Sequence, residues 1–186
     1  MPQEVFDMSF FGQPELEVIF SKEDIAKRVK ALGEEIRDDY KDVGGDVVMI
    51  GILKGCFVFL SDISRAVDLP ISIDFIGLSS YGEATQSSGV VRLTSDLSKP
   101  IAGKHVIIVE DIIDTGLTMR YLLENLEARD PASVKLCSLL EKPSKNKSGI
   151  KADYLGFEVE DKFVVGYGLD YKEQYRNVPF VGVLSA

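Results

Sequence analysis

Two apolar runs rich in β-branched residues constrain what this chain can fold into. Residues 46–53 read DVVMIGIL, and Val106–Val109 forms a second run between charged neighbours. Strands that are apolar on both faces are typical of buried, mostly parallel sheets. Segments in which apolar residues recur at helical spacing alternate with such runs along the chain. The sequence therefore predicts an α/β fold with a mainly parallel sheet flanked by helices.

The remaining elements follow the same alternation. Ser21 is followed three residues later by Asp24, which is the pattern of a capping box, so we expect a helix from there to about Tyr40. After Lys142 the chain changes to short strands and turns, which indicates an edge hairpin or a small cap over the sheet. The other expected elements are strands over 16–20, 71–78, 134–140 and 181–184, and helices over 57–67 and 117–126.

Composition limits the possible partners. The formal net charge is −9, which argues against a nucleic-acid partner because such proteins usually carry a basic face. No apolar run reaches the roughly 18–20 residues that a membrane span needs, and the start of the chain lacks the pattern of a signal peptide. Cys56 and Cys137 match no metal-binding spacing, so a reducing cytoplasm is the simplest expectation. A small phosphorylated ligand stays compatible with this charge, since a few cations, backbone N–H groups and a divalent metal can hold it.

The segment from Val106 to Thr118, VIIVEDIIDTGLT, carries the clearest chemical pattern. An apolar strand leads into Glu110 and Asp111, where we expect the strand to end, and then into a turn and a helix. Ligands of such sheets bind at the carboxyl ends of the strands. Gly116 allows close backbone approach, and the N–H groups that begin the helix can cradle a phosphate. The acids and threonines could instead only cap the helix, but three acids within five residues repel one another, which favours a cation or a diol as their partner.

This 13-residue pattern closely resembles the phosphoribosyl-pyrophosphate-binding motif of type I phosphoribosyltransferases, in the form seen in hypoxanthine-guanine enzymes. The likeness extends from about Leu16 to Leu184. It implies one domain over 1–186 with the type I phosphoribosyltransferase fold, in which a hood from about 143–186 plus the N-terminal segment binds the base. It also implies an enzyme that uses Mg²⁺ to transfer a 5-phosphoribosyl group from phosphoribosyl pyrophosphate to a 6-oxopurine in purine salvage, as a homodimer or homotetramer.

Within the motif, the resemblance assigns a role to each polar position. Glu110 and Asp111 would bind the ribose hydroxyls, directly or through a metal ion. The 5′-phosphate would be wrapped by five consecutive residues, Asp114, Thr115, Gly116, Leu117 and Thr118. Leu117 stands where the family often has a polar residue, but the loop contributes mainly its N–H groups. Asp114 would also lie near N7 of the base, where it would accept a proton.

Two loops would complete the pyrophosphate side. Lys54 and Gly55 follow the first apolar run, and in the family this loop contacts pyrophosphate and its Leu–Lys peptide can be cis. Taken alone, the pair would be a solvated lysine and a turn glycine. Ser80 and Tyr81 belong to a polar stretch over 79–89 that resembles the lid over the reacting centre. Composition alone does not separate such a lid from an ordinary surface loop.

The base would be held by the last part of the chain. In the family a lysine at the position of Lys142 bonds the oxygen at C6 of the purine, Phe163 stacks on the ring, and the Val164 backbone reads the base edge. Asp170 would approach a metal ion and its waters, and Arg176 would reach the pyrophosphate. Without the resemblance, Lys142 would be a solvated lysine and Phe163 a core residue.

Two alternatives stay open from the sequence. The chain could be a regulatory protein that kept the fold but binds effectors or RNA, although the acids, the base-site lysine and the aromatic residue argue against this. It could also be an enzyme for another base, such as xanthine. His105 and Cys56 are expected to be structural, and no role is assigned to 1–15 or 143–150.

Overall fold

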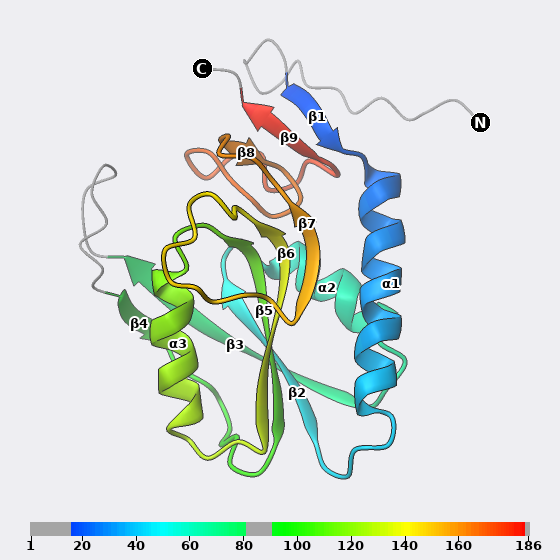
Figure 1. Cartoon of the computed structure of the whole chain (residues 1–186), viewed down its shortest axis with the longest axis vertical. Helices are drawn as coiled ribbons and strands as arrows, with labels where there is room; N and C mark the ends of the chain where they lie inside the picture. Colours follow the sequence, from blue (N-terminus) through cyan, green and yellow to red (C-terminus); the bar gives the residue numbers. More distant parts are fainter. Residues whose placement is uncertain (1–15, 81–90, 185–186) are drawn as a thin grey trace.

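Two sheets organise residues 16–80 and 91–184, the parts of the chain that the computed structural model describes (Figure 1). The larger sheet has the strand order β4-β3-β2-β5-β6-β7. Its strands are β2 (Val47–Leu53), β3 (Ile71–Ser80), β4 (Val91–Ser95), β5 (His105–Ile113), β6 (Ser133–Glu141) and β7 (Tyr154–Glu158). In this sheet β4 pairs antiparallel with β3, and the other neighbouring strands are parallel. The α/β class expected from the apolar runs is confirmed.

Helices cover both faces of the larger sheet. They are α1 (Lys22–Tyr40), α2 (Phe57–Ala66) and α3 (Leu117–Glu127). The first two pack against each other over one face, and α3 lies over the other (Figure 1). The expected capping box begins α1, since the N–H of Asp24 donates to Ser21 Oγ and the N–H of Ser21 donates to Asp24 Oδ2, each at 3.1 Å. No described helix is both long enough and apolar enough to cross a membrane.

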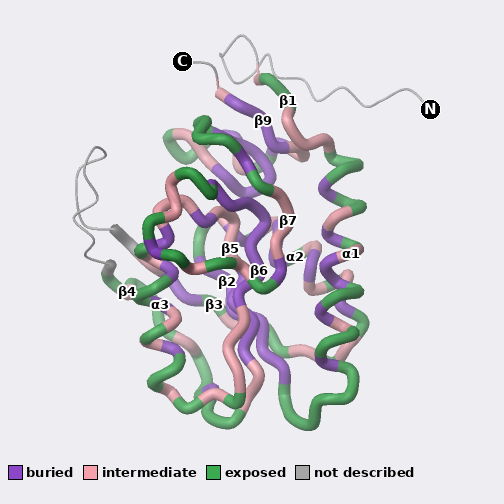
Figure 2. Tube along the Cα trace, viewed as in Figure 1, coloured by how far each residue is buried: buried purple, intermediate pink, exposed green. Residues whose placement is uncertain are grey.

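Alternate residues of the central strands enter two separate core clusters. Met49 of β2 and Ile107 of β5 pack on the side of α1 and α2, whereas Ile50 and Ile108 pack on the side of α3. All four side chains are fully buried, and Figure 2 shows the buried run through the centre of the sheet. Because both faces are covered, these strands read as continuous apolar runs instead of alternating ones.

The terminal segments form a second, smaller sheet with the strand order β1-β9-β8. Its strands are β1 (Leu16–Phe20), β8 (Val164–Val165) and β9 (Val181–Leu184). The central strand, β9, pairs antiparallel with both neighbours, so the two ends of the described chain lie side by side (Figure 1). This sheet is the small cap that the sequence led us to expect from the terminal segments.

Three expected boundaries differ from the structure. Although β7 falls in the part of the chain expected to form the cap, it pairs with β6 at the edge of the larger sheet. Strand β5 runs through Glu110 and Asp111 to Ile113, because β6 continues beside it and pairs with it that far. The two acids therefore lie within a strand and not after its end. Residues 79–80 extend β3 and pair with β4, and Tyr81 with the rest of the expected lid lies outside the described residues.

Candidate active site

The loop after β2 lies directly against an acid of β5. A Cβ built on Gly55 would come within 1.6 Å of Asp111 Oδ2, so only glycine leaves room for this carboxylate. The peptide between Leu53 and Lys54 is cis, as the family resemblance implies. The structure therefore brings the Lys54–Gly55 loop and the Glu110–Asp111 pair into one site.

Ion pairs from the segment before β9 extend this site. Arg176 lies 2.7 Å from Asp170, and Asp170 Oδ2 accepts the backbone N–H of Glu173 at 2.8 Å. The Glu173 carboxylate lies 3.0 Å from Lys54 Nζ and 3.7 Å from the Arg176 guanidinium. Sequence reasoning selected Lys54, Asp170 and Arg176 but missed Glu173. Its one signal in the sequence was its place between Asp170 and Arg176, three residues before the arginine.

Burial shifts the pKa of both β5 acids upward. Desolvation raises the pKa of Asp111 to about 6, and it raises the pKa of Glu110 well above its usual value, to which the nearby charge of Asp111 adds. Among the described residues, no hydrogen-bond donor reaches the buried Oε2 of Glu110. A buried carboxylate oxygen without a donor is costly. The pair is therefore suited to receive a cation or the hydroxyl groups of a sugar.

The donor set here fits Mg²⁺. Glu110, Asp111 and Asp170 offer carboxylate oxygens, which Mg²⁺ prefers, and this ion is usually held by one or two carboxylates together with substrate phosphates and water. Within residues 16–80 and 91–184, no group of three side chains of the kind that ligates metals converges on one point. We therefore expect oxygens of the substrate to complete the coordination.

The loop between β5 and α3 has the form of an anion cradle. Gly116 is the N-cap residue of α3, with φ at 75° in the left-handed region that glycine adopts readily. It has no side chain for capping, and the 3.5 Å contact from the Leu117 N–H to Thr115 Oγ1 is long. The first N–H groups of a helix, in the turn that holds Thr118, lack intrahelical partners and suit a phosphate. Asp114, the first residue of this loop, has a buried Oδ1 that no hydrogen bond among the described residues satisfies.

Lys142 is buried beside this cradle. Its side chain lies 3.8 Å from Asp161 Oδ1, which also pairs with Lys145 at 2.8 Å. Its backbone N–H donates to the carbonyl of Ile113 at 2.9 Å, which places it next to Asp114 across β5 and β6. With 7 % of its surface exposed, Lys142 is not the solvated lysine of the simpler interpretation.

Phe163 presents an open aromatic ring near the small sheet. It is 53 % exposed and contacts the ring of Tyr171 edge-on, with 5.6 Å between the ring centroids. The interpretation of Phe163 as a core residue is therefore wrong. The next residue, Val164, is buried and pairs with Val183 of β9. An aromatic face with this exposure is available to stack on a planar ligand.

Two residues expected to be structural lie in structural environments. His105 begins β5, at the end of the strand away from the acids, and its Nδ1 lies 2.7 Å from Ser133 Oγ. Its ring contacts Tyr40 edge-on, with the centroids 5.7 Å apart. Cys56 is fully buried, and burial raises the pKa of its thiol, so it is a poor nucleophile.

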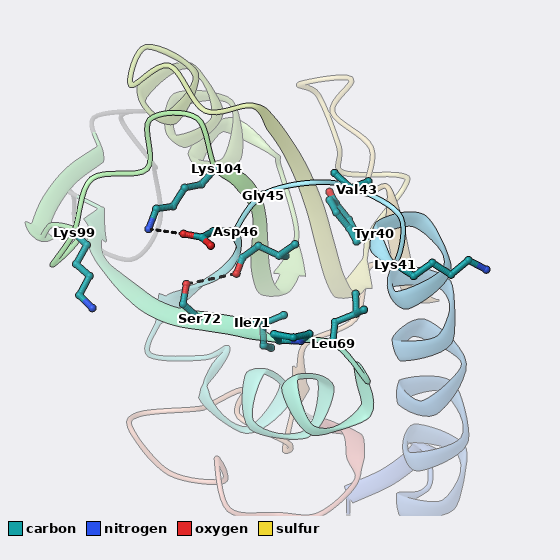
Figure 3. Close-up of a pocket in the computed structure, with 12 residues that line it drawn as sticks. Tyr40, Lys41, Val43, Gly45, Asp46, Leu69, Ile71, Ser72, Lys99 and Lys104 are labelled. Atoms are coloured by element: carbon teal, nitrogen blue, oxygen red, sulfur yellow. Dashed lines mark hydrogen bonds and ion pairs between the residues drawn. The ribbon is translucent and has the colours of Figure 1, made fainter.

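A cavity at the opposite end of the larger sheet does not belong to this site. Its volume is about 570 Å³, and it lies where β2 and β3 begin, with Asp46, Ile71 and Ser72 among its lining residues (Figure 3). Lys104 pairs with Asp46 at 3.7 Å, and Lys99 extends away from the others in this view. The cavity contains none of the site residues predicted from the sequence. Because ligands of parallel sheets bind at the carboxyl ends of the strands, we place the active site at the other end.

The family model of the phosphoribosyl transferase domain matches residues 16–172. The chain belongs to this family. It is 48 % identical over 168 residues to the hypoxanthine-guanine phosphoribosyltransferase of Bacillus subtilis (strain 168), covering 90 % of this chain and 92 % of the relative. It is 46 % identical over 172 residues to the enzyme of that name from Dictyostelium discoideum, covering 91 % of this chain and 95 % of the relative. Among solved structures, a hypoxanthine phosphoribosyltransferase from Staphylococcus aureus superposes with a TM-score of 0.89 at 41 % identity, over 98 % of this chain and 97 % of that one.

Proposed function

We propose that this phosphoribosyltransferase joins hypoxanthine or guanine to the ribose of phosphoribosyl pyrophosphate, giving IMP or GMP and pyrophosphate. The observation that carries the choice of base is the burial of Lys142, whose backbone pairs with the residue before Asp114. An ammonium has three donors and no acceptor, so it matches the C6 oxygen of an oxopurine and opposes the C6 amino group of adenine. The names of the relatives from Bacillus subtilis and Dictyostelium discoideum support the same class of base.

The site must first bind the leaving pyrophosphate and neutralise its negative charge. Lys54 and Arg176 supply the fixed positive charges that bind it, and such preorganised charge is usually the largest contribution to catalysis. Mg²⁺ held by Glu110, Asp111 and Asp170 would neutralise the remaining charge of the phosphates. The β5 acids also accept hydrogen bonds from the ribose hydroxyls.

The site must also hold the purine base and accept the proton that it loses. Its N9 attacks C1 of the ribose as pyrophosphate leaves, with inversion at C1. Asp114 accepts the proton that the base loses at N7, while Lys142 stabilises the negative charge that develops on the C6 oxygen. Phe163 stacks on the purine, and the Val164 backbone reads its edge. The lid expected from Tyr81 onward, after Ser80 at the end of β3, would exclude water from the activated ribose.

The test is release of pyrophosphate by the purified protein with phosphoribosyl pyrophosphate, hypoxanthine and Mg²⁺. We expect turnover that depends on all three and stops when excess chelator is added. Full activity in chelator would contradict the metal role, and absence of turnover with hypoxanthine and guanine would contradict the proposed substrates. Turnover with xanthine alone would keep the reaction and change the base.

The setting of the enzyme is part of the proposal. We propose a cytoplasmic location, in keeping with the two buried free cysteines, and a homodimer or homotetramer, as the family resemblance implies. Light scattering after size-exclusion chromatography measures the second point directly. A monomer at assay concentration would contradict it.

A further inference from the structure

The turn after β6, residues 143–150, lies against the phosphate cradle. A Cβ built on Gly116 would come within 2.0 Å of Ser148 Oγ and 3.0 Å of Asn146 Oδ1. The side chain of Ser148 is buried at this contact. The turn is therefore a second wall of the loop that begins α3, although nothing in the sequence alone assigned it a role.

Two hydrogen bonds fasten the turn to this loop. The backbone N–H of Lys147 donates to the carbonyl of Thr115 at 3.1 Å. The guanidinium of Arg120, in the first turn of α3, donates to the carbonyl of Ser148. One bond holds the cradle before Gly116 and the other holds the helix after it. The turn is therefore bonded to the backbone before Gly116 and to a side chain of α3 after it.

The side chain of Asn146 holds the turn in shape. Its Oδ1 accepts the N–H and the hydroxyl of Ser148, at 3.2 and 2.9 Å, and the N–H of Gly149 at 3.2 Å. Its Nδ2 donates to Glu141 Oε1 at 3.0 Å and to the carbonyl of Ile150 at 2.6 Å. Both donor hydrogens and the acceptor oxygen of the amide are thus in use. This one planar group connects the end of β6 to the later half of the turn.

We propose that Asn146 is a positioning residue for the 5′-phosphate of the substrate. It acts through the turn at Ser148, which sets the place of Gly116 and hence the direction of the N–H groups that begin α3. The inference rests on the proposed function, because it presumes that this loop binds the 5′-phosphate. The proposal concerns the phosphate cradle and not the pyrophosphate side. Lys54 and Arg176 lie on the pyrophosphate side, and their hydrogen bonds and ion pairs within the described residues go to Gly168, Asp170 and Glu173, not to the turn.

Two ligands separate these two halves of the site. GMP uses the phosphate cradle, whereas magnesium pyrophosphate uses the cations of the other side. Asn146→Ala should weaken GMP binding about tenfold, as loss of a hydrogen-bonded group in a partly buried network does. The dissociation constant of magnesium pyrophosphate should stay within about twofold, measured by titration calorimetry. In steady state, the KM for phosphoribosyl pyrophosphate should rise by a larger factor than kcat falls.

A matched control and a rescue make the test specific. Asn125→Ala removes an asparagine that accepts a hydrogen bond from Arg129 at 2.7 Å, near the far end of α3, and it should leave both affinities unchanged. Asn146→Asp faces the Glu141 carboxylate with a second carboxylate and should weaken GMP binding. Adding Glu141→Gln reverses the donor and the acceptor of this pair, so the double variant should recover part of the lost affinity.

Three results would overturn the role of Asn146. They are unchanged GMP affinity in Asn146→Ala, an equal loss of GMP and pyrophosphate affinity, and a double variant that binds GMP no better than Asn146→Asp. Thermal unfolding of each variant is measured first, so that all affinities are compared at a temperature where the domain is folded. If the unmodified protein binds neither GMP nor magnesium pyrophosphate, the proposed function itself fails, and this inference fails with it.

Discussion

The Glu173 carboxylate lies 3.0 Å from the ammonium of Lys54. The same oxygen, Oε2, lies 3.7 Å from the guanidinium of Arg176. One acid thus contacts both cations that we assign to pyrophosphate, and the hydrogen bond from Lys54, together with its charge, lowers the pKa of this carboxyl below its usual value. Glu173 therefore stands where the leaving group would bring its own negative charge.

Glu173→Gln should tighten the binding of magnesium pyrophosphate. The ion pairs are exposed, so the expected gain is about two- to fivefold, and it should shrink at high salt. Glu160→Gln is the matched control, since Glu160 is exposed and pairs with Lys162 at 3.3 Å. Titration calorimetry measures both variants. Weaker binding in Glu173→Gln would show that the carboxylate supports the site and does not compete for it.

Asp114→Asn should lower kcat far more than it weakens the binding of phosphoribosyl pyrophosphate. The change keeps the size of the side chain but removes its ability to accept a proton, and a general base typically contributes about 10²–10⁴-fold. Asp42→Asn, in the exposed turn after α1, is the control. Steady-state rates and a direct binding measurement separate the two effects. Unchanged turnover would refute the role of Asp114 as the base.

Asp111 should make the metal-free protein less stable as pH rises. Its pKa is about 6 in the folded protein and about 3.9 in an unfolded chain. Between these values the folded protein binds more protons than the unfolded chain, so the free energy of unfolding falls from about pH 4 to 6 and stays lower above.

Asp111→Asn removes this charge. In chelating buffer it should raise Tm by on the order of 3–8 °C at pH 7.5 and change it little at pH 4. Asp68→Asn, at an exposed position, should change neither value. A lower Tm for Asp111→Asn at pH 7.5 would contradict the account of this acid as a destabilising charge that waits for a ligand.

Lys142→Ala should lower kcat/KM for hypoxanthine by roughly 10–100-fold, the usual value of a hydrogen bond to a charged group. Binding of phosphoribosyl pyrophosphate should be unaffected, because the lysine lies on the base side. Lys151→Ala, which removes an exposed lysine, is the control. If both variants keep full efficiency with hypoxanthine, Lys142 does not contact the base.

The features that could be predicted from the sequence are those that depend on residues close together in the chain. Continuous apolar runs indicated strands covered on both faces, and the motif from Val106 to Thr118 indicated the cradle with its two acids. The extent of β5 was predicted wrongly, because it depends on how far β6 continues beside it. The pattern of apolar residues in β5 alone does not show how far β6 pairs with it.

Two parts of the site could not be predicted for the same physical reason. Glu173 meets Lys54 across 119 residues, and the Asn146 turn meets Gly116 from the end of another strand. Such contacts follow from the relative placement of loops, which no spacing rule records. For two other residues the fold excluded an interpretation that composition alone allowed. Phe163 is too exposed to be a core residue, and Lys142 is too buried to be a solvated lysine.

We propose that the site accepts 6-oxopurines and rejects adenine. The most direct test is kcat/KM for hypoxanthine and adenine with the unmodified enzyme under saturating magnesium phosphoribosyl pyrophosphate. A site built around a buried hydrogen-bonding group rejects the wrong partner strongly, because the group would be left unpaired. We predict that hypoxanthine is preferred by about 10⁴-fold or more. Comparable efficiency with adenine would contradict the assignment.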